Sequence, residues 1–291
     1  MIIFDEAHSQ FVAYLSGEDR ADSTILAYGK DIEQMLNHIN DTFDKTHVHH
    51  IETEHIKSFL ESLENEQYTK KSISRKINSI KTFFRFLKLN DYVIEDPSSV
   101  ISHPKFEIPA PRILSETEYR ALRDAARDDV RTHAIIELLL QSGIRIGELS
   151  EVVISDITID ESQEQGVLNI EGSRTTLARR IPLNKAAVLA IVRYLNERPE
   201  AEAPHVFVTR TGKPLLVRNI RASIDRYYKK AGIENAKVND LRHTWIAHHI
   251  KRGTSLVMLS KLAGHKRLAT TEKYLEFTDG GENNSIHLEE L

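Results

Sequence analysis

Hydrophobic residues recur at helical spacing through most of the chain, and four such stretches lie within its first ninety residues. They predict helices over about 5–16, 23–39, 53–66 and 70–89. In the last stretch, the apolar positions follow alternating steps of three and four, which is typical of one buried helix face. These positions are Ile73, Ile77, Ile80, Phe84 and Leu87. The basic residues that fall largely off this face are Lys71, Arg75, Lys81, Arg85 and Lys88.

The pattern stops at HPKFEIPAPR, residues 103–112, which contains three prolines. Closely spaced prolines cannot lie inside a regular element, so this segment predicts an extended linker. We therefore expect a helical domain over 1–103, a linker over 104–112 and a second domain over 113–291. The Ser-x-x-Glu pattern from Ser115 to Glu118 is typical of a capping box and predicts a helix that ends near Ala126.

The second domain combines helical patterns with two short β-prone runs. Helices are expected over about 130–142, 145–152, 184–197, 217–231, 239–252 and 256–263. VLNI (167–170) and RRIPL (179–183) flank GSRTTLA and predict a hairpin beside the helices. The predicted fold class is therefore α-rich with two domains, an all-α four-helix domain followed by an α+β domain with a small sheet or hairpin.

Composition narrows the class of protein. At 291 residues, two domains are the default expectation. The chain has no cysteine, which excludes disulfides, thiolate metal sites and a cysteine nucleophile. We find no signal peptide and no apolar run of membrane-spanning length, so a soluble cytoplasmic protein without a membrane partner is expected.

Charge is segregated along the chain although the formal net charge is only -4. Residues 1–66 carry 14 acidic against 4 basic residues, whereas residues 69–88 carry 7 basic residues and no acid. Such a run favours an anion-binding surface over an ordinary solvated face in so acidic a protein. Residues 206–230, with 7 basic residues and one acid, are equally compatible with a second DNA surface or with a solvated helix and loop.

Three fragments carry the candidate chemistry: SGIRIGEL around Arg145, NDLRHTW around Arg242, and GHKRLATTEKY, in which Tyr274 follows His265 by nine positions. A guanidinium group can hold a phosphate through two hydrogen bonds, so a pair of arginines can hold both non-bridging oxygens of a phosphodiester. Gly143 fits the end of a helix, and Glu148 lies one turn after Arg145 and can brace it.

In this order the fragments resemble the tyrosine recombinase family, also called phage integrases, and in particular its Xer-like branch of bacteria, archaea or mobile elements. The resemblance covers nearly the whole chain. It includes the basic fourth helix, the proline-rich junction before L-S-E-x-E, the hairpin that ends in I-P-L, and L-R-H-T. It implies a SAM-like amino-terminal domain that binds the DNA core site and a catalytic domain that cleaves and rejoins DNA strands.

The resemblance also implies residue roles. Tyr274 would be the nucleophile, Arg145 and Arg242 the phosphate clamp, and His265 a hydrogen-bonding partner of the phosphate. The product would be a 3'-phosphotyrosyl link with a free 5'-hydroxyl. A tyrosine hydroxyl has an ordinary pKa of about 10, so it needs a proton acceptor or a nearby positive charge. No metal, ATP or other cofactor is expected, and HVHH at 47–50 favours a solvated loop over a metal site.

Two positions depart from the family pattern. The family has a lysine in the hairpin turn that donates a proton to the leaving 5'-oxygen, whereas this chain has none between Lys105 and Lys185. Arg174 is nearest to that position, with Ser173 as the alternative. Asn239 stands where the family has a histidine, and it can donate a hydrogen bond to phosphate but cannot shuttle a proton. His243 is predicted to be structural.

These departures leave two alternatives to an active recombinase. One is a recombinase-derived DNA-binding protein with weak or no catalysis. The other is an enzyme similar to a type IB topoisomerase, which nicks and reseals one duplex. Strand exchange requires several active sites, so the resemblance implies double-stranded DNA and a homotetramer on two DNA sites as partners. The final segment IHLEEL (286–291) is as compatible with docking on a neighbouring protomer as with a free end.

Overall fold

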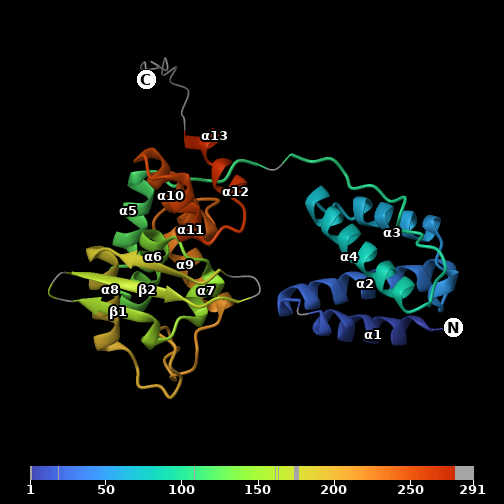
Figure 1. Ribbon diagram of the computed structural model, residues 1–291, viewed down its shortest axis with the longest axis horizontal. Coiled ribbons are helices and arrows are strands. Elements are labelled where there is room, and N and C mark those ends of the chain that lie inside the picture. The colour runs from blue at the N-terminus through green and yellow to red at the C-terminus, as the bar shows by residue number, and fades with distance from the viewer. Residues whose placement is uncertain are drawn as a thin grey trace, which may run out of the picture. The chain divides into compact units, whose positions relative to one another are not determined.

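The computed structural model describes residues 2–18, 20–107, 109–160, 162, 164–173 and 177–278 (Figure 1). The chain divides into two compact units, Met1–Ile108 and Pro109–Leu291. The division lies within the proline-rich segment 104–112 that was expected to be a linker. Among the helices that the structure describes, none is long and apolar enough to cross a membrane.

The first unit is helical, as predicted. Its helices are α1 (Phe4–Gly17), α2 (Asp22–Phe43), α3 (Thr53–Asn65) and α4 (Lys70–Leu89), with a 3-10 turn at Val48–His50. All five predicted stripe residues of α4 are buried and belong to one core cluster. Helix α2 continues four residues past its predicted end at residue 39, and Asp44 in the left-handed conformation (φ 52°) follows its last residue.

A carboxylate holds part of the basic charge of α4 inside this unit. Asp31 of α2 is 2% exposed and accepts hydrogen bonds from the guanidinium of Arg75, from Lys76 Nζ at 2.9 Å and from Ser79 Oγ at 2.8 Å. Lys76 is itself buried, whereas Lys71, Arg85 and Lys88 are exposed and Lys81 is half-buried. Part of the basic run 69–88 therefore stabilises the fold of this unit, and Arg75 is hydrogen-bonded to Asp31.

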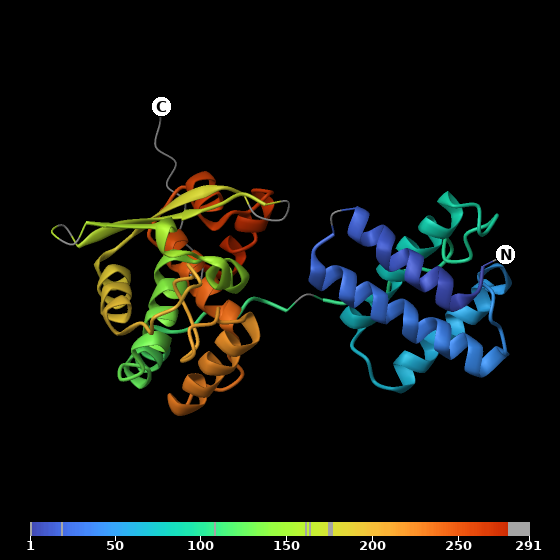
Figure 2. The same ribbon diagram turned by 90° about the horizontal axis from the view of Figure 1, so that it is seen from below.

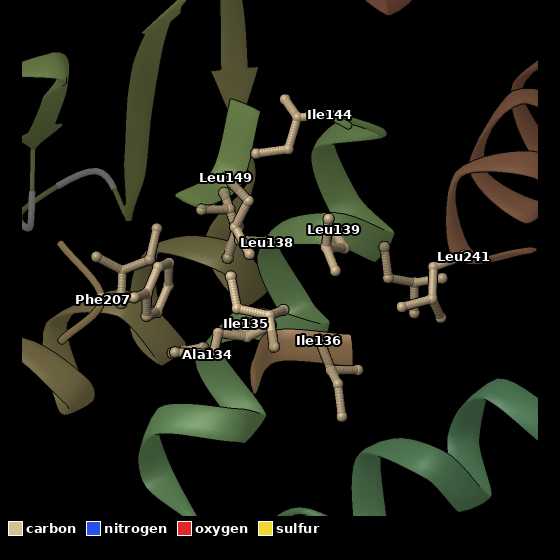
Figure 3. Packing of buried hydrophobic residues seen from close by; sticks show 14 of the residues in the cluster. Ala134, Ile135, Ile136, Leu138, Leu139, Ile144, Leu149, Phe207 and Leu241 are labelled. Atoms are coloured by element: carbon tan, nitrogen blue, oxygen red, sulfur yellow. The ribbon is translucent and has the colours of Figure 1, made fainter. Parts of the chain in front are cut away.

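The second unit is built around α6 (Val130–Ser142), which is apolar on most of its surface and buried. Figure 3 shows five of its side chains packed among Leu149, Phe207 and Leu241; the five are Ala134, Ile135, Ile136, Leu138 and Leu139. The helices packed on α6 are α5 (Glu116–Ala125), α7 (Ile146–Glu151), α8 (Lys185–Glu197), α9 (Val217–Lys230) and α10 (Val238–Lys251). Helix α11 (Leu256–Ala263) packs on α10. The capping box at Ser115 is present, because Ser115 and Glu118 accept each other's backbone N–H.

A three-stranded antiparallel sheet lies at the edge of this unit, with α8 packed on it (Figure 2). Its strands are β1 (Ile157–Asp160), β2 (Gln165–Ile170) and β3 (Arg179–Leu183), in the order β1-β2-β3. The pair β2 and β3 is the predicted hairpin. Strand β1 was not predicted, because four alternating residues are too short a signal to recognise without the strand they pair with. The register sets Ile170 opposite Arg179 at the end of the hairpin.

Candidate active site

A glycine turn places Arg145 at the start of α7. Gly143 follows the last residue of α6 with φ 63° and donates its N–H to Leu139 O at 3.0 Å, which is a left-handed helix end. The ring of Trp245 would lie 2.2 Å from a Cβ at this position, so no larger residue fits. The turn sets Arg145 as the N-cap of α7, and its side chain is 38% exposed.

Glu148 braces Arg145, as expected from their spacing. Its carboxylate accepts the backbone N–H of Arg145 at 2.8 Å and one Nη at 2.9 Å. The same carboxylate accepts two hydrogen bonds from Arg179 of β3, at 3.0 and 2.8 Å. Burial opposes the ionisation of Glu148, but the hydrogen bonds from Arg179 and Arg145 outweigh it and lower the pKa of Glu148. One carboxylate therefore positions two arginines.

Sequence reasoning did not identify Arg179. Its side chain is 5% exposed, and its Nε donates to Leu262 O at 2.8 Å. A Cβ on Gly264 would lie 2.8 Å from Arg179 Nη1, so the approach of β3 to the end of α11 depends on this glycine. The sequence signal would have been a charged residue on the core-facing side of a strand, which is visible only once the pairing of β3 is known.

The guanidinium of Arg242 on α10 is held by backbone carbonyls. Arg242 is 5% exposed and donates to Gly143 O and to Ala263 O, which lie at the ends of α6 and α11. Carbonyls at helix ends carry partial negative charge and lack helical partners, so they suit a cation. Burial, together with the charge of Arg145, lowers the pKa of Arg242 to about 10, which leaves it charged at neutral pH.

His265 lies directly after the left-handed Gly264 (φ 68°) at the end of α11. Its backbone N–H donates to Ser260 O at 3.0 Å, and its Nδ1 lies 2.7 Å from Thr271 Oγ1. Burial and the charges of Arg242 and Arg145 lower the pKa of His265 to about 4. The imidazole is therefore neutral at physiological pH and can act as a hydrogen-bonding partner rather than as a second cation.

Tyr274 lies between the short helices α12 (Ala269–Glu272) and α13 (Leu275–Thr278), which were not predicted. Its ring is 8% exposed and belongs to an apolar cluster with Trp245, Leu259 and Ala263. Burial raises the pKa of Tyr274, although the charge of Arg242 opposes the rise. The phenol is therefore protonated at neutral pH.

The hydroxyl of Tyr274 contacts an imidazole that the sequence analysis took for a structural residue. His243 Nδ1 lies 2.5 Å from the Tyr274 oxygen, and His243 Nε2 lies 2.8 Å from Asn239 Nδ2. His243 was predicted to be structural, and this contact could not be predicted, because adjacency to Arg242 in sequence does not indicate which distant side chain packs against His243. Asn239, expected to face a phosphate, uses its amide to contact the imidazole.

These side chains converge on one cleft of about 1010 Å³ in the second unit. The four residues to which the family resemblance gives catalytic roles line it: Arg145, Arg242, His265 and Tyr274. Glu148, Asn239 and His243 also line it, as do Glu171, Gly172 and Ser173 from the end of the hairpin. Arg174 lies outside the described residues. The cleft thus combines guanidinium groups, imidazoles and a phenol, which is a set suited to a phosphodiester.

Metal-binding geometry is absent from the parts of the chain that the structure describes: no three histidine, aspartate or glutamate side chains are placed to hold an ion. In the HVHH segment, Val48 is buried while His49 and His50 are exposed.

Comparison with known proteins gives matches along the chain. The phage integrase family model matches residues 112–280, and the phage integrase N-terminal SAM-like domain model matches residues 9–90. The chain is 30% identical to tyrosine recombinase XerC of Natranaerobius thermophilus over 278 residues, or 91% of each chain.

Solved structures give the same result for the fold. XerA recombinase matches with a TM-score of 0.52 at 26% identity, covering 96% of this chain and 95% of that one. A lambda integrase tetramer bound to a Holliday junction matches with a TM-score of 0.74 at 19% identity, covering 94% and 77%. With two family models on its two units and a relative similar over nearly its whole length, this chain belongs to the phage integrase family of tyrosine recombinases.

Proposed function

We propose that this recombinase cleaves and rejoins DNA by attack of the Tyr274 hydroxyl on a phosphodiester, with Arg145, Arg242 and His265 binding the phosphate. The attack forms a 3'-phosphotyrosyl link and releases a 5'-hydroxyl. A 5'-hydroxyl of another strand then reverses the step and completes the exchange. The observation that carries this proposal is that the four side chains, from three separate stretches of sequence, line one cleft.

Positive charge in the cleft stabilises the transition state. Arg145 and Arg242 are oriented before DNA binds, because their guanidinium groups already donate to Gly264 O and Ala263 O of the same helix end. Preorganised donors aimed at developing charge are worth about 10²–10³ in rate each. His265 is neutral and donates a hydrogen bond to a non-bridging oxygen.

The covalent intermediate conserves the free energy of the phosphodiester. The phosphotyrosyl bond replaces a phosphate ester bond of similar kind, so rejoining draws on no ATP. The leaving 5'-oxygen gains a proton during cleavage. Arg174 lies near that oxygen in this proposal and stabilises it by charge, because a guanidinium is too weak an acid to donate readily.

Duplex DNA is the substrate, and the protein assembles on it as a tetramer that joins two sites, as lambda integrase is seen on a Holliday junction. The exposed basic residues Lys71, Arg85 and Lys88 of α4, with Lys81, contact phosphates. A second DNA surface is the exposed basic face of α9, formed by Arg218, Arg221, Arg226, Lys229 and Lys230.

The carboxyl-terminal segment 286–291 lies outside the described residues. Its docking on a neighbouring protomer predicts that deletion of residues 280–291 impairs assembly more than binding of the first site.

The test uses a duplex site that the protein itself selects from a randomised DNA pool. A nick beside the cleavage position lets the released end diffuse away, so the covalent adduct accumulates and is counted on a denaturing gel. We expect an adduct with the wild type and none with Tyr274→Phe. Arg174→Lys should react faster, because lysine is a better proton donor.

The alternatives give different outcomes. A recombinase-derived binder would shift the duplex in a binding assay without any adduct. An enzyme similar to a type IB topoisomerase would form the adduct and relax supercoiled DNA, but would not exchange strands between two duplexes. An adduct that persists in Tyr274→Phe would refute the assignment of the nucleophile.

A further inference from the structure

Two side chains of α10 and the phenol of Tyr274 form a continuous hydrogen-bonded chain. Asn239 Nδ2 lies 2.8 Å from His243 Nε2, and His243 Nδ1 lies 2.5 Å from the Tyr274 oxygen. The ring centroids of His243 and Tyr274 are 5.7 Å apart. Both imidazole nitrogens therefore have a partner, and one partner is the atom that attacks phosphorus.

Four other groups of the cleft, Arg145, Arg242, His265 and Glu148, have partners other than the phenol. Arg145 and Arg242 remain cationic and are directed at carbonyls. His265 has its Nδ1 on Thr271 Oγ1. Glu148 is occupied by two arginines. His243 alone, among the contacts that the structure describes for the Tyr274 hydroxyl, offers a neutral basic nitrogen at hydrogen-bonding distance.

We propose that His243 takes the proton of Tyr274 on its Nδ1 during DNA cleavage and returns it during rejoining, and that Asn239 sets whether Nδ1 is free to do so. This inference rests on the proposed function of Tyr274. His243 is then a catalytic residue, since it touches the reacting oxygen, and Asn239 is a positioning residue that acts through it.

The step balances in both directions. As the phenol oxygen forms its bond to phosphorus, its proton passes to Nδ1 and the P–O5' bond breaks. The leaving 5'-oxygen takes a proton from solvent water. In rejoining, the 5'-hydroxyl of the incoming strand attacks, its proton returns to water, and the imidazolium protonates the departing phenolate.

Asn239 decides the direction of proton transfer through the orientation of its amide. When its Nδ2 donates to His243 Nε2, the imidazole carries its proton on Nδ1 and can only stabilise the phenolate. When the amide is rotated by 180°, its oxygen accepts a hydrogen bond from the Nε2–H, and Nδ1 is free to accept the proton of Tyr274. Asn239 stands where the family has a histidine. It cannot transfer a proton itself, but in this proposal it orients His243, which can.

The surroundings of His243 keep it a neutral base. The charged and titratable groups that face it are Asp240 and Arg242 of α10, the Tyr274 phenol, and His265 after α11. Burial lowers the pKa of His243; Asp240 opposes this lowering and Arg242 adds to it. The imidazole is therefore unprotonated at neutral pH, which is the form that accepts a proton.

The experiment compares adduct formation by wild type, His243→Ala and His243→Gln on two nicked duplexes of the selected site. One duplex has the natural phosphate, and the other has sulfur in place of the bridging 5'-oxygen. Because the sulfur leaves without protonation, only activation of the nucleophile is measured with it. We expect both variants to slow the adduct by about 100-fold or more on both duplexes. His243→Gln retains hydrogen-bonding capacity without basicity, and thermal unfolding checks that each variant is folded.

Controls separate this inference from the proposed function. His248→Ala, an exposed histidine of the same helix, should react like the wild type. An adduct in Tyr274→Phe would refute the nucleophile assignment itself. With that assignment intact, a wild-type rate for His243→Gln on both duplexes would overturn the role of His243. A defect limited to the natural duplex would also overturn it, because His243 would then be acting on the leaving group.

The pH profile tests Asn239. The wild-type rate should fall on acidification below the ordinary histidine range, and His243→Gln should lack this decrease. Asn239→Asp should move the decrease to higher pH, because a carboxylate beside Nε2 stabilises the imidazolium. An unmoved profile in Asn239→Asp would overturn the positioning role of Asn239.

Discussion

Both units of this recombinase bury cationic side chains, but the two settings differ in what neutralises them. In the first unit, Lys76 lies against the buried carboxylate of Asp31, which Arg75 and Ser79 also contact. In the second unit, Arg242 is as buried as Lys76, yet its described partners are two carbonyls with no full charge. A buried cation thus contacts a carboxylate in the first unit, whereas in the second unit the described hydrogen bonds of Arg242 go to carbonyls.

The difference shows which buried cations indicate function. Burying a charge is unfavourable unless a partner offsets the lost hydration. Asp31 offsets it within the folded chain, so the Lys76 site is complete. Glu148 is the carboxylate shared by Arg145 and Arg179, whereas the hydrogen bonds that the structure describes for Arg242 all go to carbonyls. In the proposed function, the DNA phosphodiester supplies a negative charge to Arg242.

Arg242→Ala gives the largest expected effect. Loss of one preorganised donor should slow adduct formation by about 10²–10³. The carbonyls of Gly143 and Ala263 also lose a donor, so the free energy of unfolding should fall by about 1–3 kcal/mol. Single-turnover adduct formation and denaturant unfolding measure the two effects. If Arg242→Ala formed the adduct at the wild-type rate, Arg242 would have only a structural role, as Lys76 has, and the contrast between the units would be lost.

Lys76→Met should lower the stability of the protein without slowing adduct formation. Methionine fills a similar volume but leaves Asp31 with fewer donors, and removal of one partner of a buried pair costs roughly 3 kcal/mol. Denaturant unfolding measures this loss. Adduct formation by the folded fraction should stay at the wild-type rate, and a slower chemical step would show that the Asp31 network contributes to catalysis after all.

Arg85→Ala combined with Lys88→Ala tests the charges of α4 that are exposed. We expect weaker binding of the selected duplex and a salt dependence whose slope falls by about one per lost phosphate contact. A titration at several salt concentrations gives both quantities. Unchanged affinity and slope would remove this part of α4 from the DNA interface.

Acidification should lower the free energy of unfolding through His265. The pKa of His265 is about 4 in the folded protein and about 6.5 in an unfolded chain, so the unfolded state binds more protons between these values. The contribution of His265 to stability is present above pH 6.5 and is lost as the pH falls toward 4. Urea unfolding at several pH values should show this loss, and His265→Gln should make the curve flatter over that range.

Most of the secondary structure could be predicted from sequence patterns that span a few neighbouring residues. The stripe of α4, the capping box at Ser115 and the turn at Gly143 each depend on residues within one or two helical turns, so the sequence predicted them directly. Strand β1 was missed, because its existence depends on pairing with β2. The short helices on either side of Tyr274 were missed because four residues give too little periodicity.

The sequence by itself indicated two units, one helical and one α+β, and the family, and it singled out Arg145, Arg242, His265 and Tyr274, which line one cleft. Only the tertiary structure decided how those residues are held. It showed that Arg179 shares Glu148 with Arg145, that Arg75 is tied to Asp31, and that His243 contacts the Tyr274 hydroxyl. The physical reason is that a helical pattern depends on residues that are close in sequence. The partner of a buried charge or of a reacting hydroxyl comes instead from a distant segment that packing brings into contact.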